Sequence, residues 1–154
     1  MKDAVHAANA PHPIPLPEEL AFVEIQRTAD ILSRNVAHLL KAEDLSSNQY
    51  NVLRILRGAP EGLPCGEIAA RMISRDPDIT RLLDRLEKRS LISRCRETRD
   101  RRMVMVSITA AGKKLLARTD APIRDAHTRQ LGHLGPGRLH KLTDLLNAAR
   151  QHIT

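Results

Sequence analysis

The sequence predicts a mainly α-helical protein with one small β-hairpin, an α+β fold in which helices dominate. The chain of 154 residues has one Phe, one Tyr and no Trp, so aliphatic side chains must form its core. Leucines recur at helical spacing along much of the chain, which is typical of amphipathic helices. Only residues 91–108 combine β-favouring runs with a polar turn. This length fits one domain that folds without metals or disulfides.

The N-terminal part predicts a flexible arm followed by a long helix. Residues 1–17 contain four Pro and no apolar periodicity, which is typical of an unpacked segment. From Glu18 to about Lys41, apolar residues recur at helical intervals, so an amphipathic helix with an unmet partner surface is expected.

Three short helices are expected next. Ser46 and Gln49 match a capping box, with Leu45 and Tyr50 as a hydrophobic staple, and this helix ends at the Gly and Pro residues of 58–62. A second helix spans roughly Cys65 to Met72. Asp76-Pro77 is the start signal of a third, near residues 76–89, with one apolar face. Such a set fits a helix-turn-helix unit.

A hairpin and two further helices complete the chain. Strands are expected from Leu91 and over residues 103–108, with Glu97–Arg102 as the turn. Thr109 caps a helix toward Leu131, in which Pro122 predicts a kink or break. Gly135-Pro136 opens a last helix whose apolar residues are expected to face inward: Leu139, Leu142, Leu145, Leu146, Ala149 and Ile153.

The charge distribution favours an anionic partner such as nucleic acid. The formal net charge is +7, with a pI near 10.1. Residues 1–70 carry 6 Lys/Arg against 9 Asp/Glu, whereas residues 71–102 carry 11 against 6. Ten of those eleven are Arg, whose forked guanidinium suits phosphate and guanine.

Two neighbouring surfaces carry the candidate DNA contacts. If Leu82, Leu83 and Leu86 face the core, Arg81 and Arg85 share the opposite side of the helix with Asp78 and Thr80, and can reach base edges. The alternative is a solvated face with an Asp84–Lys88 ion pair. The hairpin, or wing, adds five guanidiniums that could straddle phosphates: Arg94, Arg96, Arg99, Arg101 and Arg102. Asp100 is expected to orient these arginines rather than to contact DNA. The alternative is that the wing is only a soluble loop.

Ile79–Ile92, Asp100-Arg101-Arg102 and Ile108-Thr109-Ala110-Ala111-Gly112 resemble the MarR family of transcriptional regulators. The resemblance implies a winged helix-turn-helix region at 45–109, with helical dimerisation regions at 18–44 and 110–154. It implies a homodimer on a pseudo-palindromic operator in double-stranded DNA. The DNA-binding residues expected from the pattern and the resemblance are Ser47, Asn48, Gln49, Arg75, Asp78, Thr80, Arg81, Arg85, Arg94, Arg96, Arg99, Arg101 and Arg102.

The sequence departs from the family pattern at two helix ends. Ser90 stands where the family usually has Gly, and a non-glycine residue in a left-handed C-cap costs on the order of 1 kcal/mol. Pro64-Cys65 stands where a Ser or Thr cap is common.

The resemblance also allows regulation by a ligand. In many members a small aromatic or phenolic effector releases DNA, and the approximate positions of Phe22, His38, Tyr50 and Arg54 suit such a cleft. These residues could equally serve packing or lie on the surface. The expected function is therefore a repressor released by an effector. Redox control through Cys65 or Cys95, and sequence-indifferent architectural binding, are the alternatives.

Other functional classes lack a pattern. The seven His residues show no metal-ligand spacing, and there is no Gly-rich phosphate loop, so neither an enzyme nor a cofactor is expected. The two Cys indicate no disulfide framework. No segment suits secretion or membrane spanning, so a cytoplasmic protein is expected.

Overall fold

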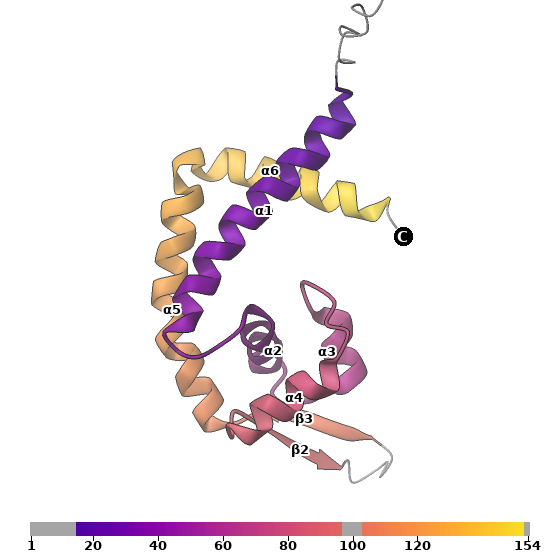
Figure 1. Ribbon diagram of the computed structural model, residues 1–154, viewed down its shortest axis with the longest axis vertical. Coiled ribbons are helices and arrows are strands. Elements are labelled where there is room, and N and C mark those ends of the chain that lie inside the picture. The colour runs from indigo at the N-terminus through magenta and orange to yellow at the C-terminus, as the bar shows by residue number, and fades with distance from the viewer. Residues whose placement is uncertain (1–14, 97–102, 153–154) are drawn as a thin grey trace, which may run out of the picture. The chain divides into compact units, whose positions relative to one another are not determined.

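The computed structural model describes residues 15–96 and 103–152, and it divides into two units between Ser33 and Arg34. The first unit holds most of α1 (Pro17–Lys41). The second holds the end of α1 and the remaining elements (Figure 1): α2 (Ser47–Arg57), β1 (Leu63–Pro64), α3 (Cys65–Arg71), α4 (Ile79–Lys88), β2 (Ile92–Arg96), β3 (Val104–Ile108), α5 (Ala110–Leu131), the 3-10 turn η1 (Gly132–Leu134) and α6 (Gly135–Gln151). This confirms the helix-dominated fold with a small sheet. Most of the predicted arm (residues 1–14) and the hairpin turn lie outside the described residues.

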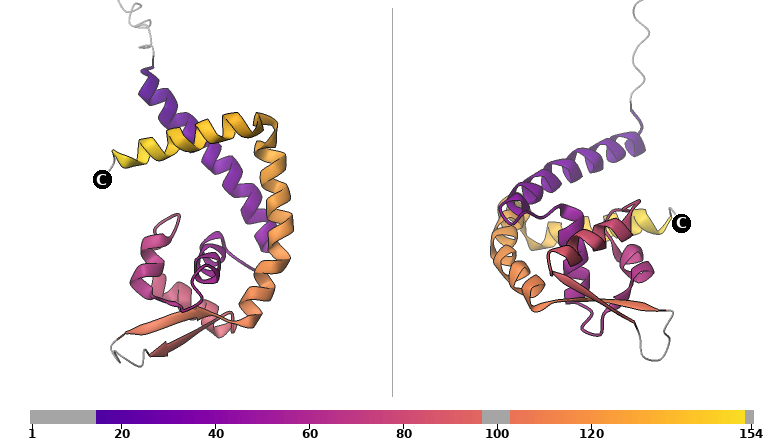
Figure 2. Two further views of the ribbon diagram at one scale, coloured as in Figure 1. Left: turned by 180° about the vertical axis from the view of Figure 1, so that it is seen from behind. Right: turned by 60° about the horizontal axis from the view of Figure 1, so that its bottom comes forward.

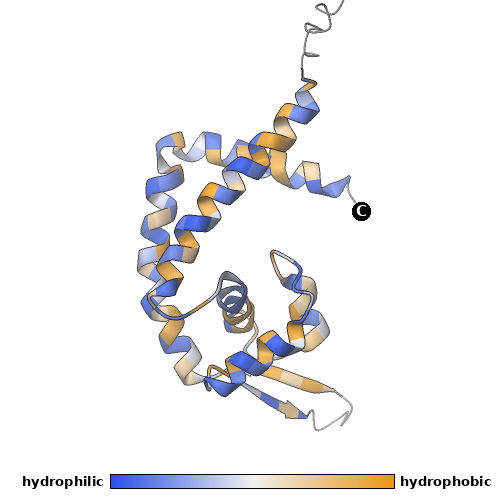
Figure 3. Ribbon diagram, in the orientation of Figure 1, coloured by the Kyte–Doolittle hydropathy of each residue, from blue (hydrophilic) through white to orange (hydrophobic). Residues whose placement is uncertain are grey.

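In the first unit, α1 follows the predicted amphipathic pattern. Figure 3 shows hydrophobic and hydrophilic patches alternating along it. Its large apolar side chains are between 40% and 63% exposed: Leu20, Phe22, Val23, Ile25 and Ile31. The predicted need for a partner surface is not met among the described residues of this unit.

The core of the second unit is aliphatic, as the shortage of aromatic residues predicts. α2, α4 and α5 each contribute a buried face, and Tyr50 is the one aromatic residue among the buried side chains that the structure describes. The ten most completely buried side chains are Leu40, Val52, Leu53, Leu56, Ile68, Leu83, Leu86, Ile92, Val106 and Leu116. Burying a Leu or Ile side chain stabilises a fold by roughly 1.5–3 kcal/mol, so this cluster holds the helices together.

The sheet has three antiparallel strands in the order β1-β3-β2. The predicted hairpin is confirmed, with Ile92 opposite Ile108 and Arg96 opposite Val104. β1 was not predicted, because two residues form no alternating pattern. Gly62 allows it: its φ is +81°, and a Cβ there would stand 2.8 Å from the carbonyl oxygen of Val106.

The capping box at the start of α2 is confirmed. The Ser46 hydroxyl accepts from the Gln49 N–H at 3.1 Å, and the Gln49 side chain accepts from the Ser46 N–H at 3.0 Å. α3 begins where predicted, although Pro64 supplies no side-chain cap.

The predicted start of α4 at Asp76-Pro77 is wrong. The N-cap is Asp78, whose Oδ1 accepts from the Arg81 N–H at 3.1 Å. The Asp76 side chain instead accepts from the Asp78 N–H at 2.9 Å, forming a turn before the helix. Its other oxygen accepts from Asn48 of α2 at 2.8 Å, so a contact 28 residues away fixes the choice.

α4 ends in a left-handed turn at Ser90, the position where the family usually has Gly. Ser90 has φ +57°. Its N–H donates to the Glu87 carbonyl at 2.8 Å, and the Leu91 N–H donates to the Leu86 carbonyl at 3.0 Å. This pair of bonds is a Schellman motif, with buried Leu86 and Leu91 as its apolar contact.

The Ile-Thr-x-x-Gly segment joins that turn to α5. Thr109 caps α5 by accepting from the Gly112 N–H, and its hydroxyl donates to the Ser90 carbonyl at 2.6 Å. The Thr109 N–H also donates to the Leu91 carbonyl at 3.1 Å. Any Cβ at Gly112 would collide with that carbonyl oxygen, so glycine lets α5 begin here.

Two expectations for the C-terminal helices are corrected. α5 is one continuous helix through Pro122, so the predicted break does not occur, whereas the alternative of a kink at this residue stays a prediction. α6 begins at Gly135-Pro136 as predicted, but none of its described residues is buried within this chain. Leu139 and Leu146 are half-buried, Ala149 is exposed, and Ile153 lies outside the described residues. Leu142 is 37% exposed and Leu145 is 70% exposed. Figure 2 shows α6 leaving η1 in a different direction from α5.

The left-handed Ser90 gives a stability prediction. Ser90→Gly should raise the free energy of unfolding by about 0.5–1 kcal/mol, because glycine adopts positive φ without the Cβ clash. Urea unfolding at fixed protein concentration measures the change. Ser93→Gly in β2 is the control, and it should destabilise; a loss of stability in both variants would contradict the prediction.

Candidate nucleic-acid interface

The candidate reading face of α4 lies on the surface. Leu82, Leu83 and Leu86 are buried, whereas Arg81 and Arg85 are exposed. Thr80, Asp78 and, just before the helix, Arg75 are exposed as well. Asp78 also caps the helix, so one carboxylate oxygen is already engaged.

The side chains at the start of α2 are mostly engaged within the protein. Asn48 donates to Asp76 at 2.8 Å and accepts from the Ser74 hydroxyl at 3.2 Å, which ties α2 to the loop before α4. Gln49 completes the capping box. Of the three DNA contacts predicted here, Ser47 is exposed, whereas Asn48 and Gln49 are half-buried.

Arg94 does not project from the wing as predicted. Its guanidinium lies 2.7 Å from Asp84 Oδ1 and 3.0 Å from Glu87 Oε2, and donates to the Thr80 carbonyl at 3.4 Å. The Arg94 side chain is only 25% exposed. It therefore fastens β2 to α4, and both views of Figure 2 show the hairpin beside that helix. Asp84 has Arg94 as its ion-pair partner, where the alternative interpretation had Lys88.

The rest of the wing is described only at its base. Arg96 and Cys95 are exposed on β2. Arg99, Asp100, Arg101 and Arg102 lie outside the described residues.

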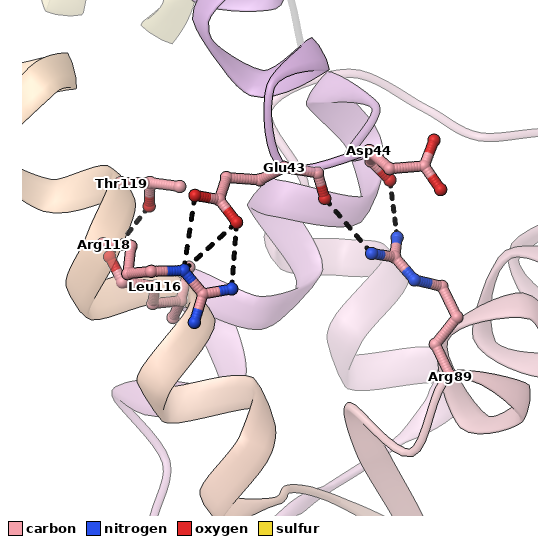
Figure 4. A network of polar contacts seen from close by, with 6 residues as sticks. All are labelled: Glu43, Asp44, Arg89, Leu116, Arg118 and Thr119. Atoms are coloured by element: carbon pink, nitrogen blue, oxygen red, sulfur yellow. Dashed lines mark hydrogen bonds and ion pairs between the residues drawn. The ribbon is translucent and has the colours of Figure 1, made fainter.

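A polar network connects the turn after α1 with α4 and α5 (Figure 4). Arg89, the C-cap of α4, donates to the carbonyls of Asp44 at 2.5 Å and Glu43 at 3.1 Å. The Glu43 carboxylate accepts from Arg118 of α5 at 2.9 Å. The Arg118 hydrogen bond and charge hold the pKa of Glu43 below its usual range, so the pair is ionised at neutral pH.

A second ion pair joins α2 to α5. Arg57 lies 2.8 Å from Asp120 and makes a forked contact with it. This hydrogen bond lowers the pKa of Asp120 and raises that of Arg57. Sequence reasoning missed both networks, because their partners lie 63 and 75 residues apart in the chain.

The four predicted cleft residues do not form one described cluster. Tyr50 is buried with the Arg54 guanidinium 5.8 Å from its ring centroid, a cation-π distance. His38 lines a separate cavity of about 340 Å³ with residues of α5. Phe22 lies in the first unit and is 63% exposed.

Cys65 and Cys95 carry free thiols, the first half-buried and the second exposed. Within residues 15–96 and 103–152 there is no group of three His, Cys, Asp or Glu side chains placed to hold a metal ion. Of the helices formed by those residues, none combines the length and apolarity needed to cross a bilayer.

The sequence and the fold match known transcriptional regulators. The MarR family pattern matches residues 45–104. A solved MarR transcription factor from Planctomyces limnophilus is 40% identical, with a TM-score of 0.66, over 89% of this chain and 99% of that one. The chain belongs to the MarR family. The predicted resemblance is confirmed, and the matched relatives are transcriptional regulators rather than enzymes.

Two further relatives have described roles. The homoprotocatechuate degradative operon repressor of Escherichia coli is 27% identical over 108 residues, 70% of this chain and 72% of the repressor. The transcriptional repressor CouR, solved with a 23-mer DNA duplex, is 28% identical with a TM-score of 0.77, over 86% and 94% of the two chains. CouR from Rhodococcus jostii RHA1 is also solved with p-coumaroyl-CoA, at 26% identity and a TM-score of 0.75, over 86% and 92%.

The Arg94 clamp gives a second prediction. Arg94→Ala should lower the free energy of unfolding by about 1 kcal/mol, because it removes one cation from a two-carboxylate network at the protein surface. Thermal or urea unfolding checks this, with exposed Arg96→Ala as the matched control. In an Asp84→Asn/Glu87→Gln background, Arg94→Ala should cost less. Equal costs in the two backgrounds would show that the clamp does not stabilise the fold.

Proposed function

We propose that this protein is a sequence-specific regulator that binds double-stranded DNA and represses transcription. The observation that carries the proposal is the exposed Arg81/Arg85 side of α4, held on a helix whose opposite side is buried. A helix of this kind fits the major groove, where arginine pairs with guanine O6 and N7. The CouR complex with a DNA duplex supports the same use of the fold.

The wing supplies the second contact. Its described base is fastened beside α4, because Arg94 of β2 is paired with Asp84 of the reading helix. Arg96 and the predicted contacts Arg99, Arg101 and Arg102 are proposed to bind phosphates and the minor groove, with Asp100 orienting them. Arg94 is not among the proposed DNA contacts, because its guanidinium is already paired.

The functional unit is proposed to be a homodimer. The apolar side chains on α1 and α6 are exposed in the single chain, with Leu145 at 70% and Phe22 at 63%. Apolar surface of this extent is typical of protein interfaces. A two-fold dimer presents two α4 helices, which suits a pseudo-palindromic operator.

Release by a small-molecule effector is part of the proposal. The CouR complex with p-coumaroyl-CoA shows that one relative takes an aromatic ligand. In this chain the Tyr50–Arg54 pair and the cavity beside His38 are the candidate sites, with Phe22 as a further candidate. Because its target is DNA, we place the protein in the cytoplasm.

In vitro selection of bound duplexes, followed by competition, tests the regulator function. The selected site should outcompete random DNA by at least roughly a thousandfold, as specific regulators do. Arg81→Ala should relax that preference by about 1–3 kcal/mol at the base it contacts. Arg124→Ala, an exposed arginine on α5, is the control. Equal affinity for all duplexes would instead indicate an architectural binder.

The dimer has its own test on α6. Leu145→Glu should shift the protein toward monomer, because it places a charge in the proposed apolar interface. His140→Glu, an exposed residue on the other side of the same helix, introduces the same side chain and should leave the dimer intact. Sedimentation equilibrium distinguishes the two. A monomeric wild type, or a Leu145→Glu dimer as tight as wild type, would contradict the proposed interface.

A further inference from the structure

A basic groove lies between α4 and the turn that joins α1 to α2. It has a volume of about 550 Å³. Lys41 and the start of α2 form one side, and Arg85, Lys88 and Arg89 of α4 and its C-cap form the other. Of these cations, the sequence pattern predicts only Arg85 as a DNA contact, because the groove forms only when α4 packs beside this turn.

The positive charge of the groove is not balanced within the protein. Four cations line it against one carboxylate, Asp44. Among the residues that the structure describes, Lys41, Arg85 and Lys88 have no ion-pair partner. Arg89 is held by two backbone carbonyls, which carry no net charge. Figure 4 shows the Asp44 carboxylate pointing away from that guanidinium. Like charges held this close repel each other, so an anion in the groove is favoured.

The N-terminus of α2 borders the groove. Ser46 and Gln49 line the groove and satisfy each other's N–H groups through the capping box. The N–H groups of Ser47 and Asn48 have no acceptor among the described residues. The turn contains no acidic residue, so this helix end keeps its partial positive charge.

The groove continues the proposed reading face and avoids its acidic side. Asp84 and Glu87 are paired with Arg94 on the wing side of α4. The unpaired cations of the groove that belong to α4, Arg85 and Lys88, lie on the other side of this helix. A DNA strand bordering the major groove that α4 enters carries a phosphate at each nucleotide, and these are the anions closest to this side of the helix.

We propose that this groove seats a backbone phosphate of the bound DNA, with Lys41 and Lys88 as its side-chain contacts. The inference rests on the proposed DNA-binding function. The contact positions α4 on the duplex and adds affinity for any sequence, whereas Arg81 and Arg85 read bases.

The test compares two double variants of the full-length protein. Lys41→Gln/Lys88→Gln removes the proposed contacts, and Lys114→Gln/Lys141→Gln removes the same charge from exposed positions on α5 and α6. Binding to the selected operator and to random duplex is measured from 50 to 300 mM salt. The groove variant should lower the slope of log affinity against log salt by about 0.9 for each phosphate that it no longer neutralises. Its preference for operator over random DNA should equal that of wild type.

A second experiment identifies the DNA phosphate that the groove binds, by removing the charge of one phosphate at a time. Replacing single operator phosphates by methylphosphonate should identify one position, in each half-site, that weakens wild type but has no effect on Lys41→Gln/Lys88→Gln. Thermal unfolding confirms that both double variants are folded, as is expected for exposed lysines. If the groove variant keeps the salt slope of the control, or if every methylphosphonate weakens both proteins equally, the groove holds no phosphate.

The outcomes separate this inference from the function on which it rests. Wild-type protein without preference for any duplex would overturn the sequence-specific regulator. In that case, a lowered salt slope in the groove variant would still support the phosphate contact. A specific wild type with an unchanged groove variant would overturn only the inference made here.

Discussion

The turn at Ser90 and Leu91 is the constraint on which the interface depends. It lies between the end of α4 and the start of β2. It also binds the start of α5, because Thr109 donates hydrogen bonds to the carbonyls of both residues. Gly112 leaves the space that this approach needs. The reading helix, the wing and the first turn of α5 are therefore fixed at one point. The strain of a left-handed serine is tolerated here because the surrounding hydrogen bonds and the burial of Leu86 and Leu91 stabilise this turn.

Arg94 provides the second restraint, and it also neutralises the acidic side of α4. A hairpin attached only at its base could rotate about that attachment, whereas the ion pairs to Asp84 and Glu87 hold β2 against the helix. The same pairs neutralise two carboxylates that would otherwise repel DNA phosphates from the wing side of α4. Thus Arg94, although it is not one of the proposed DNA contacts, changes the electrostatic field around the proposed DNA-binding surface. The cations on the opposite side remain unpaired within the described chain, so they are available to a polyanion.

Local signals predicted most of the elements, and contacts distant in sequence decided the rest. The Ser46–Gln49 capping box, the Thr109 cap and the leucine spacing each act within one or two turns, so the sequence alone identified them. Asp76 and Asp78 are both suitable caps, and only Asn48, 28 residues earlier, makes Asp76 a turn residue instead. β1 depends on Val106, 43 positions after Leu63. In the candidate site, periodicity predicted the Arg81/Arg85 face. It could not predict the pairing of Arg94 or the place of Lys41, because both depend on how α4 packs.

The single chain does not bury the apolar residues of α6, contrary to the prediction from its sequence. Its leucines follow a helical pattern, and such a pattern forms where one side of a helix excludes water. Within the single chain none of the described residues of α6 is buried, and the large apolar residues of α1 are exposed within the first unit. The aliphatic core of the second unit is complete without them, since α2, α4 and α5 bury one another. The pattern on α1 and α6 is therefore not explained by folding of this chain. The proposed homodimer explains it, because association would cover these residues and place two α4 helices in one particle, as the proposed two-fold operator requires.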